Sequence, residues 1–153
     1  MKNAQQLVAE AKTQVKQVTV QQLANVLRTK TATIAEHDEA DEDGQAQMNA
    51  LLIDVREPEE FMAGHVETSV NLPRGVLEMK LHQHPAVAAY SDADAALAAL
   101  ATMPLYLICR SGARSALAAL SLQQMGFTQL YSVEGGFVAW VEAGFRIETS
   151  SST

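Results

Sequence analysis

Four short runs of mostly apolar residues recur after residue 49, and each is followed by a segment with helical features. The runs are Ala50–Val55, Ser69–Leu72, Leu105–Ile108 and Leu130–Val133. Runs of this length and composition are typical of strands buried on both faces of a parallel sheet. Strands that alternate with helices predict the α/β class, with a central, mostly parallel sheet of four to five strands flanked by helices.

Two further helices and a loop are expected in the N-terminal third of the chain. Apolar residues recur at helical spacing over residues 3–16 and predict an amphipathic helix, whose apolar face packs on the domain or on a second copy of the chain. A homo-oligomer formed through this N-terminal helix is therefore one expectation. Thr19 and Gln22 have the spacing of a capping box, which predicts the start of another helix. Residues 28–49 are polar and acidic, and we expect a mobile loop there.

Helix signals also separate the apolar runs. Pro58 is placed for the first turn of a short helix, where its missing N–H has no cost. Ser91 and Asp94 predict the cap of a helix that ends near Ala101. Gly126 is typical of the residue that closes a helix.

The residue composition excludes several classes of function. The net charge of −7 disfavours nucleic acid or an anionic membrane as a partner. A single cysteine excludes an intrachain disulfide and a CxxC redox pair. No apolar run is long enough to span a bilayer, and no continuous apolar stretch marks a signal peptide, so we expect a cytoplasmic protein. We expect one domain at residues 18–148, with a helical extension at 1–17 and a flexible tail at 149–153.

Cys109 lies where the third apolar run ends, at the sheet edge where open α/β proteins bind ligands. It is followed by a short loop that consists of Arg110, Ser111, Gly112, Ala113, Arg114 and Ser115. Gly112 permits a tight turn, so that loop N–H groups and the next helix N-terminus face an anion. Arg110 and Arg114 add positive charge. All these effects favour the thiolate, so the sequence predicts a nucleophilic cysteine rather than a buried structural one.

Three ordered motifs resemble those of the rhodanese family. The first comprises Asp54-Val-Arg56, Glu60-Phe61, Gly64-His65-Val66 and Asn71-Leu-Pro73. The second is Cys109-Arg-Ser-Gly-Ala-Arg-Ser115, and the third comprises Met125-Gly-Phe127 and Glu134-Gly-Gly-Phe-Val-Ala-Trp140, with Gly144 after it. The resemblance covers roughly residues 18–148 and implies a rhodanese-like fold. The family usually has glycine at the position of Thr68, so the turn before the second strand is expected to differ.

The resemblance implies a sulfurtransferase of two steps. The Cys109 thiolate would take the outer sulfur of a small anionic donor, thiosulfate or a persulfide, and would become a persulfide. A thiol or cyanide would then accept the sulfur. The loop N–H groups would stabilise the anionic persulfide and the departing anion. The resemblance implies no metal and no organic cofactor, and the single cysteine means that the acceptor is external.

Several polar residues outside the loop are candidates for supporting roles. Asp54 ends a buried strand and is expected to orient backbone around the site, and Arg56 and Glu60 to form part of a polar network. Arg74 follows the second strand and is a candidate second contact for the anion. His65 is expected to be structural. His82 and His84 are spaced too weakly to predict a metal site, because no other ligand stands near them.

Two other functions remain open at this point. Cysteine phosphatases, and arsenate reductases with related chemistry, also place a thiolate and an arginine around an anion, usually with five residues between them. Only four separate Cys109 from Arg114, which makes a tighter cradle, better suited to a terminal sulfur than to a phosphate. A non-catalytic rhodanese-like module that binds a partner is the second alternative, and the intact cysteine and its loop argue against it.

Overall fold

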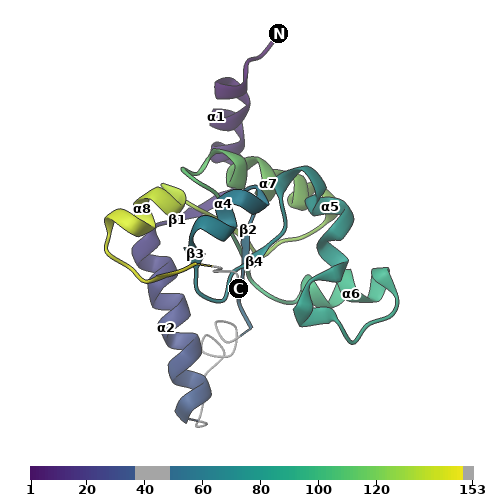
Figure 1. Ribbon diagram of the computed structural model, residues 1–153. Helices are drawn as coiled ribbons and strands as arrows, with labels where there is room; N and C mark the ends of the chain where they lie inside the picture. The colour runs from purple at the N-terminus through teal and green to yellow at the C-terminus, as the bar shows by residue number, and fades with distance from the viewer. Residues whose placement is uncertain (37–48, 150–153) are drawn as a thin grey trace.

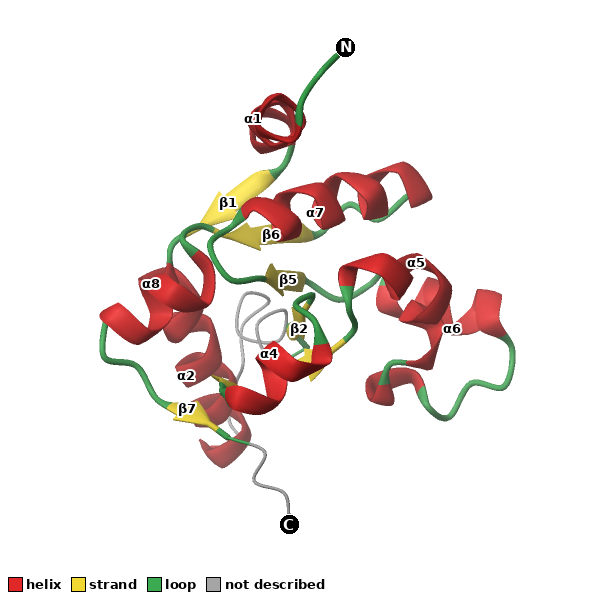
Figure 2. Cartoon of the chain, turned by 45° about the horizontal axis from the view of Figure 1, so that its top comes forward, coloured by secondary structure: helices red, strands yellow, loops and turns green. Residues whose placement is uncertain are grey.

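A five-stranded, entirely parallel sheet lies at the centre of the protein (Figure 1). Its strand order is β1-β6-β5-β2-β4, and Figure 2 shows β1, β6, β5 and β2 side by side in this order. The computed structural model describes residues 1–36 and 49–149. The strands of the sheet are β1 (Lys16–Val18), β2 (Leu51–Asp54), β4 (Val70–Asn71), β5 (Leu105–Ile108) and β6 (Leu130–Val133). The prediction of a mostly parallel sheet of four to five strands is confirmed.

The central strand β5 shows why an uninterrupted apolar run forms this sheet. Alternate side chains of a strand point to opposite faces. Leu105 and Leu107 accordingly lie in one apolar cluster, whereas Tyr106 and Ile108 lie in the other. Because both faces of β5 are buried, every position in the strand has to be apolar.

Helices cover both faces of the sheet. They are α1 (Ala4–Gln14), α2 (Val20–Glu36), α4 (Pro58–Ala63), α5 (Leu77–Lys80), α6 (Ala93–Leu100), α7 (Ala113–Met125) and α8 (Gly136–Glu142). Single 3-10 turns are η1 (Arg74–Val76), η2 (Leu81–Gln83) and η3 (Pro85–Val87). Figure 2 shows α2 and α8 on one side of the sheet and α5, α6 and α7 on the other. This arrangement confirms the predicted α/β layer structure.

The N-terminal helix packs on the domain through part of its length. In α1, Ala11 is fully buried, and Val15 follows it into the cluster that contains α7. Leu7, one turn earlier, is 46% exposed, so the apolar stripe is only partly covered. Figure 1 shows the free end of α1 projecting from the body of the protein. The strand β1 then begins at Lys16, across the boundary expected at residue 17. A homo-oligomer through α1 stays a prediction.

The expected loop at 28–49 is wrong for its first part, because α2 continues to Glu36. The predicted capping box at the start of α2 is present. The Gln22 N–H donates to Thr19 Oγ1 at 3.1 Å, and the Thr19 N–H donates to Gln22 Oε1 at 2.8 Å. Polarity alone does not stop a helix, and residues 28–36 contain neither glycine nor proline. The remainder of the acidic segment, 37–48, and the end of the expected tail, 150–153, lie outside the described residues.

A small antiparallel pair closes the fold beside α4. It consists of β3 (His65–Val66) and β7 (Ile147–Glu148). In the turn after β3, Thr68 has a left-handed φ of +72°, a conformation that glycine accepts more readily than threonine. Among the described residues, every helix is too short or too polar to cross a membrane.

Candidate active site

The Cys109 loop, defined here as residues 109–115, joins β5 to α7 at the carboxyl edge of the sheet. The Gly112 N–H donates a hydrogen bond to Cys109 Sγ at 3.1 Å. Gly112 has a φ of +103°, a left-handed conformation in which a side chain would be strained. It immediately precedes α7, so the positive end of that helix dipole lies beside the sulfur. The loop thus brings a backbone donor and a helix N-terminus to the cysteine.

The sulfur lies beneath this loop and not on the surface. Cys109 is 1% exposed, whereas Arg110 and Ser111 are exposed. The sequence predicted a nucleophilic cysteine rather than a buried structural one, and in this conformation the Cys109 side chain is buried. The cause is the alternation of β5: residue 109 continues the series of Leu105 and Leu107, so its side chain points into the apolar cluster beneath α7.

A pair of buried hydroxyl groups lies on the inner side of the sulfur. The Cys109 thiol donates to Ser115 Oγ at 3.5 Å, and Ser115 Oγ is 2.8 Å from Ser132 Oγ on β6. Both serines are fully buried. A buried charge is tolerated only where hydrogen bonds satisfy it. If the sulfur is ionised, the Ser115 hydroxyl can reverse and donate to it while Ser132 completes the chain.

The N-terminus of α8 holds the loop backbone in place. The Phe137 N–H donates to the Cys109 carbonyl at 2.8 Å, and the Val138 N–H donates to the Arg110 carbonyl at 3.0 Å. These bonds fix both carbonyl groups toward α8. Gly136 makes this approach possible, since a Cβ atom there would lie 2.5 Å from the Cys109 carbonyl oxygen. The sequence indicated Gly135 and Gly136 only as part of the third motif, because nothing local in the sequence predicts this contact.

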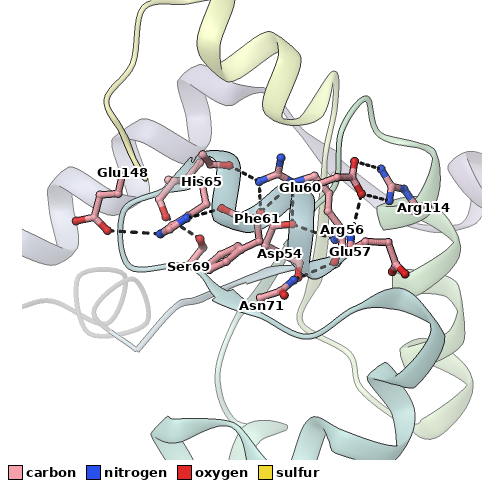
Figure 3. Close-up of polar contacts among 12 residues, drawn as sticks. Asp54, Arg56, Glu57, Glu60, Phe61, His65, Ser69, Asn71, Arg114 and Glu148 are labelled. Carbon is pink, nitrogen blue, oxygen red and sulfur yellow. Dashed lines mark hydrogen bonds and ion pairs between the residues drawn. The ribbon is translucent and has the colours of Figure 1, made fainter. Parts of the chain in front are cut away.

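The Arg114 side chain forms an ion pair with α4. Its two terminal nitrogens lie 2.7 and 3.0 Å from the two carboxylate oxygens of Glu60 (Figure 3). The Arg114 hydrogen bond is the main favourable cause that lowers the pKa of Glu60 to about 2, against the opposing effect of burial. The same bond raises the pKa of Arg114. Arg114 therefore ties the Cys109 loop to α4.

Asp54 and Arg56 form a second, buried ion pair at the end of β2. Arg56 Nη2 lies 2.8 Å from Asp54 Oδ2 and also donates to the Gly64 carbonyl at 2.7 Å. The Arg56 guanidinium stacks 4.2 Å from the centroid of the Phe137 ring. One cluster of charged side chains contains Arg56 and Glu60, for which a polar network was predicted, and also Asp54, which was predicted to orient backbone. It joins β2, α4 and α8 around the loop, and no contact of Asp54 or Arg56 reaches the sulfur in the described structure.

Arg74 and the histidines play other parts. Arg74 Nη1 pairs with Glu78 at 3.2 Å on the same helical segment, so its charge is directed along α5. His65 Nδ1 lies 2.8 Å from the Phe61 carbonyl oxygen, and its ring stacks on Phe61. The described residues contain no group of three or more side chains that could hold a metal ion, and His84 instead accepts a hydrogen bond from the Ala86 N–H.

Comparison with known proteins places this geometry in context. The family model of the Rhodanese-like domain matches residues 33–143. The uncharacterized protein YqhL of Bacillus subtilis is 34% identical over 91 residues, which are 60% of this chain and 60% of that relative. The chain thus matches less than two thirds of that relative's length. The thiosulfate sulfurtransferase GlpE of Vibrio cholerae is 31% identical over 104 residues, 68% of this chain and 84% of that protein.

Two solved structures share the fold over nearly the whole chain. The polysulfide-sulfur transferase homodimer of Wolinella succinogenes is 25% identical with a TM-score of 0.64, over 96% of this chain and 88% of that one. A protein of Rhodopseudomonas palustris, described as a possible tyrosine phosphatase, is also 25% identical with a TM-score of 0.64, over 97% and 96%. The same fold is therefore found in a polysulfide-sulfur transferase and in a possible tyrosine phosphatase. The geometry of the Cys109 loop has to distinguish between these two functions.

Proposed function

This chain belongs to the family of rhodanese-like domains, and from that premise we propose that it is a sulfurtransferase that carries sulfane sulfur as a persulfide on Cys109. The observation that supports the proposal most strongly is the 3.1 Å hydrogen bond from the Gly112 N–H to Cys109 Sγ. A donor aimed at the sulfur stabilises negative charge there, which is the charge of both the attacking thiolate and the persulfide.

In the first step, the Cys109 thiolate attacks the outer sulfur of the donor. A new S–S bond forms, and the bond that held the outer sulfur breaks. With thiosulfate, sulfite leaves with the electron pair of that bond, and Cys109 is left as an anionic persulfide. With an organic persulfide, a thiolate leaves and the proton of the outer sulfur stays on the new persulfide. Gly112, Ser115 and the N-terminus of α7 would stabilise the negative charge of the attacking Cys109 thiolate and, after thiosulfate, of the anionic persulfide.

In the second step, an external nucleophile takes the outer sulfur. A cellular thiol, or cyanide in an assay, attacks it, and the Cys109 thiolate leaves. The chain has one cysteine, so no second thiol of this chain is available as the acceptor. Transfer therefore ends on a separate molecule, with the enzyme returned to its starting form.

The burial of the sulfur adds one requirement to this mechanism. Cys109 is 1% exposed, so a donor reaches its sulfur only if part of the surrounding structure moves. The Arg110 carbonyl is hydrogen-bonded to α8, and the Gly112 N–H is hydrogen-bonded to the sulfur. The short segment of the loop between these two hydrogen bonds is held less firmly than its ends. We propose that this segment is the entrance for donor and acceptor.

Phosphatase activity and a purely binding role are the alternatives. Four residues separate Cys109 from Arg114, and both terminal nitrogens of this arginine are engaged by the Glu60 carboxylate. A phosphate at the loop would lack the arginine that cysteine phosphatases use. This observation favours sulfur transfer over phosphate hydrolysis.

The test compares two reactions of the purified protein. We expect thiocyanate to form from thiosulfate or a persulfide plus cyanide, and no release of the phenol from an aryl phosphate. Cys109→Ser is expected to abolish thiocyanate formation and to change the free energy of unfolding in urea by no more than about 1 kcal/mol, because the exchange is nearly isosteric. Hydrolysis of the aryl phosphate without thiocyanate formation would reverse the assignment, and neither reaction would favour the binding module.

A further inference from the structure

The guanidinium of Arg114 forms an ion pair with Glu60 and is not free to pair with the donor. Both terminal nitrogens of the guanidinium face both carboxylate oxygens, at 2.7 and 3.0 Å. Such a two-point contact fixes the planar guanidinium in orientation as well as in charge. Arg114 is close enough to Cys109 for the two to interact electrostatically. The Glu60 carboxylate therefore neutralises a positive charge that would otherwise act on the sulfur.

Glu60 is itself held in this position from two sides. The Glu57 N–H donates to Glu60 Oε1 at 3.0 Å as part of the capping box that starts α4. The positive charge of Arg56 acts on the same carboxylate. With its pKa lowered to about 2, Glu60 is negatively charged at every physiological pH. The ion pair is therefore a permanent feature of the site.

The other arginines at this sheet edge are committed as well. Arg56 follows β2 and pairs with Asp54 at 2.8 Å, and Arg74 follows β4 and pairs with Glu78 at 3.2 Å. In the part of the chain that the structure describes, Arg110 is the guanidinium at this edge for which no carboxylate partner is recorded, and it is exposed. The loop and Glu60 together thus present one net positive charge, from two arginines and one glutamate.

One positive charge matches some sulfur donors better than others. Thiosulfate is a dianion and releases sulfite, another dianion, so its reaction with a thiolate gathers three negative charges at the loop. An organic persulfide reacts in its protonated form by RS–SH + Cys109–S⁻ → RS⁻ + Cys109–S–SH, which gathers one negative charge, and even its anion RS–S⁻ would bring the total only to two. Repulsion between like charges in a buried site is strong, because the effective dielectric constant is lower than in water.

We propose that Glu60, by engaging Arg114, directs this site toward organic persulfides and away from thiosulfate. Glu60 is in this view a specificity-determining residue that acts through Arg114 and not by touching the donor. The inference rests on the proposed function, because it presupposes that Cys109 accepts sulfane sulfur.

The experiment measures the second-order rate of sulfur loading onto the full chain, by intact mass, with two donors. The donors are thiosulfate and cysteine persulfide, and the variants are wild type, Glu60→Gln and Glu59→Gln. Glutamine retains the capping box of α4, so Glu60→Gln is expected to fold. Glu59→Gln removes the same charge from an exposed position of the same helix that has no recorded bond to Arg114, and serves as the matched control.

We expect Glu60→Gln to raise the rate with thiosulfate by about tenfold and to change the rate with cysteine persulfide by less than about twofold. Because the ratio of the two rates is compared between variants, the intrinsic reactivity of each donor cancels. Glu59→Gln should leave the ratio unchanged, and the added substitution Arg114→Gln should remove the gain.

The outcomes separate this inference from the proposed function. If wild type gains sulfur but Glu60→Gln leaves the ratio of the two rates unchanged, Glu60 does not set donor preference, although Cys109 is still a sulfur carrier. An equal change of the ratio in Glu59→Gln would mean that general charge and not Arg114 is responsible, and would also overturn the inference. If wild type gains no sulfur from either donor, the proposed function itself fails.

Discussion

Adding a single methyl group at Gly136 should damage the site more than the same change at Gly126, which also has a left-handed conformation. Gly136 has a φ of +58°, and a Cβ atom would lie 2.5 Å from the Cys109 carbonyl oxygen and 2.6 Å from that of Arg110. Real Cβ atoms do not approach backbone oxygen so closely, and both contacts are to backbone that cannot rotate away. Gly136→Ala therefore has to push α8 and the Cys109 loop apart.

The size of the effect follows from three contributions. A left-handed conformation costs an alanine about 1–2 kcal/mol, which the lower entropy of the unfolded chain offsets by about 0.4–1 kcal/mol. Overpacking against fixed backbone adds about 1–3 kcal/mol. Gly136→Ala is thus expected to lower the free energy of unfolding by about 3 kcal/mol, a large share of the roughly 5–15 kcal/mol of a typical domain.

Gly126→Ala is the matched control. Gly126 has a φ of +109°, and no other atom lies within 4 Å of the position that a Cβ atom would take, so the substitution carries the strain without the collision. We expect a loss of about 1 kcal/mol in urea unfolding and normal sulfur loading by intact mass. Gly136→Ala should lose about 2 kcal/mol more and load at least tenfold more slowly, because the loop backbone moves. If the two variants unfold and load alike, the contact between α8 and the Cys109 loop does not support the site.

Three further substitutions test the surroundings of the loop. Thr68→Gly should stabilise the protein by about 0.5–1 kcal/mol in urea unfolding and by more than Thr68→Ala does, since Thr68 has a φ of +72°; a loss of stability would contradict the strain. Asp54→Asn should cost about 3–5 kcal/mol, because Arg56 would be left charged and buried, and an unchanged unfolding midpoint would refute that. Glu60→Gln should cost about 1 kcal/mol at pH 7, a value reduced for the partial exposure of the pair. Folding lowers the pKa of Glu60, so the contribution of this carboxylate to the free energy of unfolding is complete above about pH 4.5 and disappears as the pH falls through about 2. A stability difference between Glu60→Gln and wild type that does not shrink over this pH range would contradict the ion pair.

Much of the fold was predictable because it depends on local patterns. The strands β5 and β6 begin and end where the apolar runs do, since burial on both faces demands such runs. The strand β1 gave no comparable signal: it has three residues, begins with an exposed lysine and pairs only at the edge of the sheet. The predicted cap of α6 was one residue off, because Asp92 and not Ser91 accepts from the Ala95 N–H.

The site was predictable only in part. The groups that contact the sulfur from within the loop are close in sequence, whereas the residues that hold the loop in place are far from it in sequence. Cys109 and Gly112 lie within one loop, so their spacing in the sequence indicates their contact. The partner of Arg114 is Glu60, which lies 54 residues away, and the partner of Ser115 lies on another strand. Such pairings depend on how α4 and β6 are placed in space, so the sequence predicted a positive charge from Arg114 at the loop but not the direction or the partner of its side chain.

The most direct test of the account is the mass of the protein after it meets a sulfane donor. Wild type incubated with cysteine persulfide or thiosulfate should gain one sulfur atom, located on Cys109 by peptide mapping, and should lose it again on addition of cyanide. Cys109→Ser should gain none. A wild-type protein whose mass stays unchanged with every donor, or a sulfur atom that is still gained by Cys109→Ser, would contradict the claim that this cysteine carries the sulfur.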